Sequence, residues 1–307
     1  MPTAVWGARV PELPWCPDAL VAALESAFVA RVAAEPRAVA HTSAGWQALG
    51  ASVRGKAHAH RGEHRDDALA VRAAESLLVL AVADGAGSSS LSRVGAAVTA
   101  EIAVAQTVAR YDASSIDEPD GSRLGTAMAH AVHDAALRLH DLATAADVSP
   151  AAFRTTLLLV AILGDLMLVS QVGDGAVLVQ YRDDTVARVG AMRETAWAGE
   201  VSCFVPDACA MTQAAALRQL RASDVALIAL MTDGVDDPFH PLEQTGEALI
   251  TQWRHGTSTS IGTAQQAPVE SVLVSTDALV RWLSFEQRGE VDDRTLLLAW
   301  RHDETPA

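Results

Sequence analysis

The feature that most constrains this chain is a set of short apolar runs, each about as long as one buried strand. Leu77–Ala83 and Val225–Met231 are apolar throughout, and Thr295–Trp300 is similar. Runs of this length bounded by Gly and Asp are typical of buried strands, whereas a bilayer-spanning helix needs about 18 to 20 apolar residues. We therefore expect a fold built on sheets and no membrane span.

An aspartate stands at one edge of each of these runs. Asp84 follows the first run and leads into Gly85, Asp233 follows the second after one Thr, and Asp292 precedes the third. A carboxylate at a strand end lies where a sheet opens to water. Several such ends brought together make a set of hard oxygen ligands for Mg²⁺ or Mn²⁺. The sequence therefore predicts a site for a hard divalent cation.

The rest of the pattern predicts an α+β fold in which helices cover packed sheets. Further strands are expected at Gln47–Val53, Ala68–Ala73, Thr155–Leu163, Leu166–Val172 and Ala176–Tyr181. Helices are expected at Ser92–Tyr111, Arg123–Ala146, Pro241–Trp253 and Val269–Phe285, because apolar residues recur there with helical spacing. Asp165 and Arg182-Asp183-Asp184 are expected to form hairpin turns.

Two segments are expected to lie outside the central sheets. Residues 1–48 form an N-terminal extension, with early prolines and one amphipathic helix over Asp18–Glu35 that either packs on residues 49–303 or docks a partner. Residues 183–222 contain no long apolar run. They are expected to form a lid or partner-binding loop carrying Trp197, Phe204 and Pro206, or a surface excursion packed on its own domain.

Charge and cysteine usage narrow the class of protein. The net charge of −15 argues against a nucleic-acid or anionic-membrane surface, since both partners attract clustered Lys and Arg. The three cysteines form no CxxC motif and are expected to be free thiols in a reducing compartment. The N-terminal residues carry acidic side chains and lack the pattern of a signal peptide, so a cytoplasmic location is expected.

Single motifs leave alternatives open. Asp66-Asp67 follow a run of basic side chains: His58, His60, Arg61, His64 and Arg65. Two carboxylates beside such a run suit either a site that holds metal and phosphate together or a solvated charged turn. These histidines match no strong zinc spacing. Asp84-Gly85 alone also fits a turn before a helix, and Gly173-Asp174-Gly175 alone fits a hairpin turn.

The order of the motifs is more specific than any one of them. In sequence they are Asp66-Asp67, Asp84-Gly85, Thr155-Thr156, Gly173-Asp174-Gly175, Thr232-Asp233-Gly234 and Asp292-Asp293-Arg294-Thr295. Over residues 49–301 this series resembles the type-2C metal-dependent Ser/Thr protein phosphatases. Gly55–Leu69 and the flap-like residues 199–204 look like a bacterial branch of that family.

The resemblance implies an antiparallel β-sandwich flanked by helix pairs, with two Mn²⁺ or Mg²⁺ ions at one end. It implies that Asp84 bridges both ions, that the Gly85 carbonyl ligates one, and that Asp233 and Asp292 complete the other. It further implies that Asp66 holds water ligands and that Asp67 orients the attacking water. The implied partner is a phosphorylated protein whose phosphoserine or phosphothreonine is hydrolysed, opposing a Ser/Thr kinase.

Several positions depart from the family pattern. Gly62 stands where the family often has a phosphate-holding arginine, so Arg61, His58 or Arg65 is expected to take that role. Asp293 replaces the usual Asn after the last ligand, Gly175 replaces a common Ser, and Ala151 aligns with an Asp that helps bind a third ion in many relatives. A two-metal site is therefore expected. The alternatives are a pseudophosphatase used as a binding or sensing module, and a hydrolase of small phosphoesters.

Overall fold

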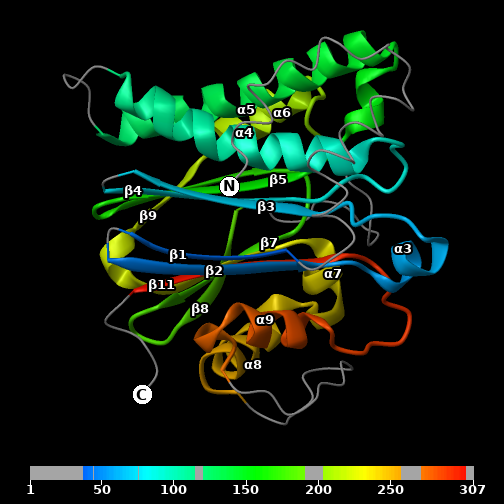
Figure 1. Ribbon diagram of the computed structural model, residues 1–307. Coiled ribbons are helices and arrows are strands. Elements are labelled where there is room, and N and C mark those ends of the chain that lie inside the picture. The colour runs from blue at the N-terminus through cyan, green and yellow to red at the C-terminus, as the bar shows by residue number, and fades with distance from the viewer. Residues whose placement is uncertain are drawn as a thin grey trace.

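The centre of the molecule is a sandwich of two antiparallel sheets, seen in a computed structural model that describes residues 37–43, 45–74, 76–114, 120–190, 203–256 and 271–301 (Figure 1). One sheet has the order β1-β2-β11-β10-β7-β8, formed by Arg37–Ser43, Trp46–Val53, Arg294–Arg301, Val225–Met231, Ala176–Tyr181 and Val186–Val189. The other has the order β3-β4-β5-β6-β9, formed by Ala68–Ala74, Leu77–Ala83, Leu157–Leu163, Leu166–Val172 and Arg218–Arg221.

Apolar side chains alternate between the two faces of each sheet, as a strand buried on both sides requires. Leu80 of β4, Val160 of β5 and Ile228 of β10 belong to the core between the sheets. Their neighbours in sequence point the other way, so Val79 and Leu159 join a second core beneath the helices on the β3-β4-β5-β6-β9 sheet. The continuous apolar runs in the sequence are thus explained by burial on both faces.

Helices cover both outer faces of the sandwich (Figure 1). The long helices α4 (Ser92–Asp112) and α5 (Asp120–Ala146), with the short α6 (Cys209–Ala215), lie over one sheet, while α8 (Leu242–His255) and α9 (Thr276–Leu283) lie over the other. Short 3-10 turns occur at Pro150–Phe153, Ala222–Asp224, Asp237–Phe239 and Val272–Val274. The expected α+β fold, an antiparallel β-sandwich with flanking helix pairs, is confirmed.

The helix expected over Val269–Phe285 is shorter than predicted. Its described part is a 3-10 turn followed by α9, and the two are separated by Ser275, whose hydroxyl oxygen accepts a hydrogen bond from the backbone of Ala278 at 3.1 Å. This N-cap satisfies a backbone donor that a continuous helix would have bonded internally. Among the described helices, none has the length and apolar character that crossing a membrane demands.

Part of the expected lid belongs to the sandwich, so that prediction is wrong for its two ends. β8 and β9 are four-residue edge strands, paired with β7 and β6, and the polar side chains of β9 suit a sheet edge. Pro206 is buried, while Trp197 lies outside the described residues. The predicted turns at Asp165 and at residues 182–184 do connect antiparallel neighbours.

Two further expectations are corrected. The Gly173-Asp174-Gly175 segment is no hairpin turn, because β6 and β7 lie in different sheets and this segment carries the chain from one sheet to the other. Cys203 and Cys209 are not free thiols but form a disulfide. β1 lies within residues 1–48 and pairs with β2 along its whole length, so the sandwich includes residues from the expected N-terminal extension.

Gly95 provides a test of how tightly α4 packs at its start. A Cβ atom at Gly95 would lie 1.9 Å from the backbone oxygen of Phe153, whereas one at Gly121 of α5 would meet only a Leu166 methyl at 3.8 Å. We expect Gly95→Ala to lower the free energy of unfolding by about 1–3 kcal/mol or more through overpacking. Gly121→Ala should be neutral or stabilising by up to about 1 kcal/mol. Urea denaturation of both variants checks this; equal stabilities would show that α4 shifts freely.

Candidate metal and phosphate site

Strand register brings the acidic motifs to one end of the sandwich. Ala68 of β3 pairs with Ala83 of β4, so Asp67 and Asp84 flank one sheet end. Met231 of β10 pairs with Leu296 of β11 and with Ala176 of β7, so the residues after β10 and before β11 and β7 share the end of the other sheet. The sequence motifs far apart in the chain therefore meet, as the pattern of strand-edge aspartates predicts.

The carboxylates of Asp84, Asp67 and Asp233 form a cluster in which Asp67 is buried and the other two are half-buried. Asp84 shares hydrogen bonds with both neighbours, and the charges of Asp67, Asp233 and Asp292 all act on it. Burial raises the pKa of Asp84 and Asp67 well above the usual range, and the neighbouring carboxylates raise it further. Burial, followed by the charge of Asp174, raises the pKa of Asp233 to about 7. A protein that buries acids in this way gains stability from a bound cation.

Hydroxyl groups hold the cluster in place. Thr232 and Thr295, from the two strand ends of one sheet, both donate to Oδ2 of Asp67 on the other sheet, at 2.9 and 2.7 Å. The backbone of Asp84 is held by Thr155 and Thr156: the Thr155 hydroxyl donates to the Asp84 carbonyl at 2.7 Å, and the Asp84 N–H donates to the Thr156 hydroxyl at 3.1 Å. The threonine pair singled out in the sequence thus supports the central aspartate.

Glycines allow the backbones at this end to approach closely. A Cβ atom at Gly234 would lie 1.9 Å from the backbone oxygen of Asp293, and one at Gly85 would lie 2.8 Å from the backbone of Ser92 at the start of α4. Any larger residue would push these segments apart. The glycine after each of the first two predicted ligands is therefore required by packing.

Asp293 joins the N-terminal part of the site to β11, a role that sequence reasoning missed. Its Oδ1 accepts from the backbone of Gly55 at 2.6 Å, and its Oδ2 accepts from the backbone of Asp66 at 2.5 Å and lies 3.0 Å from Nδ1 of His58. Both carboxylate oxygens are used, whereas an Asn side chain has only one acceptor oxygen. This explains why Asp stands where the sequence pattern leads one to expect Asn.

His58 lies on the short helix α3 (Lys56–Arg61) and is almost buried between acids. The hydrogen bond with Asp293, together with the charges of Asp293, Asp66 and Asp292, raises the pKa of His58 from 6.5 to about 9 against the opposing effect of burial. Ligand atoms of His58, Asp292 and Asp293 all lie within 4.8 Å of one another, so this group could hold a metal ion. Without metal, the protonated imidazole itself supplies a positive charge there.

The cationic candidates for the phosphate differ in their surroundings. Arg61 is half-exposed and forms an ion pair with Glu63 at 2.5 Å, while Arg65 is buried and donates to the backbone oxygens of Asp67 and Ser52. Sequence reasoning missed Arg93 on the first turn of α4, whose charge lowers the pKa of Asp66 against the stronger effect of burial. Its neighbour Ser92 donates to Asp66 Oδ2 at 2.9 Å, so the start of α4 faces this carboxylate.

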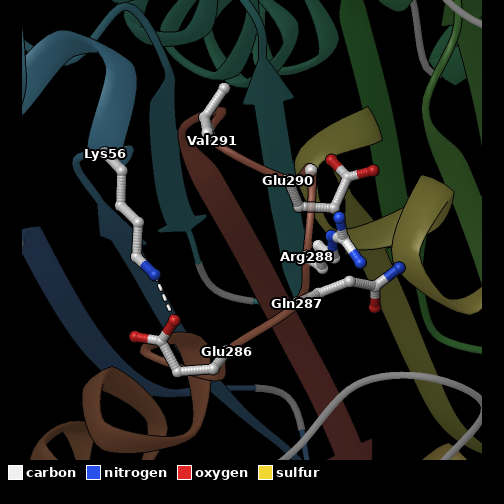
Figure 2. Close-up of a pocket in the computed structure, with 7 residues that line it drawn as sticks. Lys56, Glu286, Gln287, Arg288, Glu290 and Val291 are labelled. Carbon is white, nitrogen blue, oxygen red and sulfur yellow. Dashed lines mark hydrogen bonds and ion pairs between the residues drawn. The ribbon is translucent and has the colours of Figure 1, made fainter.

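A cavity of about 480 Å³ opens beside the Asp292 loop (Figure 2). Lys56 on α3 and Glu286 form an ion pair across it, and the segment from Gln287 to Val291 lines the rest. The backbone of Ala57 donates to the Val291 carbonyl at 2.9 Å, which ties this wall to α3. Charged side chains line this cavity, and its last lining residue, Val291, directly precedes Asp292.

Comparison with known proteins agrees with this geometry. Residues 54–284 match the family described as Protein phosphatase 2C. A bacterial serine phosphatase is 13% identical, with 83% of this chain and 97% of that chain covered and a TM-score of 0.55. Serine/threonine phosphatase Stp1 of Staphylococcus aureus is 14% identical, with 85% and 97% covered and a TM-score of 0.55.

The serine/threonine phosphatase PstP/Ppp of Mycobacterium tuberculosis is 18% identical, with 83% of this chain and 98% of that chain covered and a TM-score of 0.50. No curated protein matches the chain. At these identities the structures establish the shared fold, and the family match covers most of the chain. The chain therefore belongs to the protein phosphatase 2C family of metal-dependent Ser/Thr protein phosphatases.

Proposed function

We propose that this phosphatase hydrolyses phosphoserine and phosphothreonine in proteins by means of water activated at a site for two Mn²⁺ or Mg²⁺ ions. The observation that supports this most is the cluster of Asp67, Asp84 and Asp233, whose pKa values are all raised by removal from water and by neighbouring carboxylates. Such a cluster is costly in the absence of cations. Hard carboxylate oxygens are the ligands that Mg²⁺ and Mn²⁺ prefer.

In this proposal Asp84, Asp233, Asp292 and the Gly85 carbonyl hold the metal, and Asp66 binds water at its edge. When bound, a pair of divalent ions lowers the pKa of water and neutralises phosphoryl oxygens. The protein's own contribution is orientation. Thr232 and Thr295 fix one oxygen of Asp67, which keeps this carboxylate directed for holding the attacking water.

The phosphate is assigned to the α3 segment. Arg61 lies on α3 with His58, and its half-exposed guanidinium can exchange Glu63 for a phosphate oxygen. His58 adds a second positive charge next to Asp66. We further propose that the physiological substrate is a protein phosphorylated by an opposing Ser/Thr kinase, and that residues 49–303, together with β1 and the start of β2, are the catalytic unit.

A cytoplasmic location is part of the proposal, and the Cys203–Cys209 disulfide weighs against it, since disulfides are rare in reducing compartments. Titrating free thiols in denatured protein taken from its own cells decides the matter. Three free thiols would support a reducing compartment, because the chain has three cysteines. A single free thiol would place the protein in an oxidising one.

One observation favours a second candidate, a pseudophosphatase that binds phosphoproteins without turning them over. Gly62 stands in place of an arginine, and Arg61 beside it is already paired with Glu63. The same acidic cluster would then hold metal for binding alone. Turnover of p-nitrophenyl phosphate and of a phosphopeptide separates the candidates. A protein phosphatase hydrolyses both substrates, and a pseudophosphatase hydrolyses neither. A hydrolase of small phosphoesters hydrolyses p-nitrophenyl phosphate only.

Metal removal provides the first test of the proposal. We expect the protein to hydrolyse both substrates with Mn²⁺ or Mg²⁺ and to lose the activity in EDTA, because without a divalent ion nothing lowers the pKa of the attacking water or neutralises the phosphoryl oxygens. Adding back excess Mn²⁺ should restore the rate. Undiminished hydrolysis in the chelator would exclude a metal mechanism.

Asp233→Asn separates the metal role from a structural one. Removing one of several crowded acids should raise the melting temperature of chelator-treated protein by a few degrees, since about 1 kcal/mol corresponds to roughly 2–4 °C in a domain of this size class. The same change should abolish activity and most of the Mn²⁺-induced rise in melting temperature. The control is Asp141→Asn on the exposed face of α5. A strongly destabilised Asp233→Asn apo protein would show that the residue is structural.

Arg61→Ala tests the phosphate contact. If Arg61 binds ground and transition states alike, KM for the phosphopeptide should rise several-fold with kcat nearly unchanged. Arg72→Ala, an exposed arginine on β3, controls for loss of general positive charge. An equal KM in both variants would show that Arg61 does not bind the phosphate, and His58, Arg65 and Arg93 would then be the candidates for that contact.

A further inference from the structure

Arg188 on the edge strand β8 touches two loops of the acidic site at once. Its Nη1 lies 3.2 Å from Oδ2 of Asp236, and its Nη2 donates to the Gly175 carbonyl at 2.7 Å. The two side chains of this ion pair are 8% and 0% exposed, which distinguishes it from the half-exposed surface pairs. A buried guanidinium that serves two acceptors on different segments holds those segments at a fixed separation.

Each of the two segments carries an acid of the cluster. Asp236 closes α7, the single helical turn that begins with Asp233, and the backbones of Asp236 and Val235 both donate to the Thr232 carbonyl at 3.0 Å. Gly175 directly follows Asp174, whose charge is the leading neighbouring influence on the pKa of Asp233. The Arg188 side chain therefore contacts both the segment that carries Asp174 and the segment that carries Asp233.

The ladder between β7 and β10 ends at the pair Ala176 and Met231, so strand pairing fixes the spacing of the two segments up to there, and Asp174 and Asp233 lie beyond it. Gly175 has a φ of +87° and lies so near Met231 that a Cβ atom would be 2.8 Å from the Met231 carbonyl oxygen. The Gly175 segment therefore cannot move closer to the end of β10. Arg188 attracts both the Gly175 carbonyl and the Asp236 carboxylate, so it opposes their separation. α7 contains one turn, so it has little rigidity of its own.

We propose that Arg188 is a positioning residue that sets the distance between the Asp174 and Asp233 segments, and thereby tunes the affinity of the acidic site for its divalent ions. This inference rests on the proposed metal site. It assigns no contact between Arg188 and substrate or metal. Groups that orient metal ligands from outside commonly contribute about 10–100-fold to metal affinity.

The test compares Arg188→Met, Arg188→Lys and the double variant Arg188→Met/Asp236→Asn with the wild type. Mn²⁺ binding is measured by calorimetry, and phosphopeptide turnover is measured across Mn²⁺ concentrations. We expect about tenfold weaker Mn²⁺ binding for Arg188→Met, with kcat at saturating Mn²⁺ within about threefold of wild type. Arg188→Lys should fall between the two, because an ammonium group cannot reproduce the planar fork of the guanidinium.

The double variant guards against misfolding, since it removes the buried positive and negative charges together; it should fold and still bind Mn²⁺ weakly. Arg110→Met is the control, because Arg110 pairs with Asp134 between α4 and α5. It should bind Mn²⁺ with wild-type affinity. Wild-type Mn²⁺ affinity in folded Arg188→Met or in the double variant would overturn the inference. Failure of the wild type to bind Mn²⁺ would instead overturn the proposed metal site.

Discussion

The repulsion among buried carboxylates is the interaction on which the rest of this structure depends. Asp84, Asp67 and Asp233 approach closely enough to share hydrogen bonds, which two ionised carboxylates cannot do. Such crowding is tolerated only if protons or cations neutralise part of the charge. The surrounding residues are therefore arranged to keep acids in place that would otherwise move apart.

Contacts that hold the acids also fasten the two sheets together. Thr232 and Thr295 belong to one sheet and donate to Asp67, which begins the other. Asp293, just before β11, accepts from the backbone of Asp66, just before β3. The apolar core between the sheets stabilises the sandwich as a whole, whereas these polar bonds fix how the strand ends meet. Assembly of the site is thus a consequence of correct sheet-on-sheet packing.

The two-sheet fold and the positions of the acidic motifs could be predicted from the sequence, because both depend on short apolar runs and the aspartates at their edges. The apolar runs before Asp84 and Asp233 are long enough to identify both strands. Antiparallel pairing sets Asp84 beside Asp67 at the end of one sheet and Asp233 beside the start of β11 at the end of the other, and packing of the two sheets brings these ends together. β8 and β9 were missed because each has only four residues, too few to show a strand pattern, and β9 is also mostly polar, as an edge strand can be. Asp293, Arg93 and Arg188 were missed as parts of the site because their contacts join residues distant in sequence. The Cys203–Cys209 bond was missed because its spacing fits no common motif.

Electrostatic compensation divides the acids of the site into two groups. Two fully buried carboxylates have protein cations beside them: Asp293 contacts His58, and Asp236 contacts Arg188. For the half-buried Asp84 and Asp233, the leading influences on the pKa are burial and other carboxylates. A protein that pairs some acids with cations and crowds others together concentrates uncompensated negative charge at one point. In the proposed metal site, that point is where divalent ions would gain most on binding.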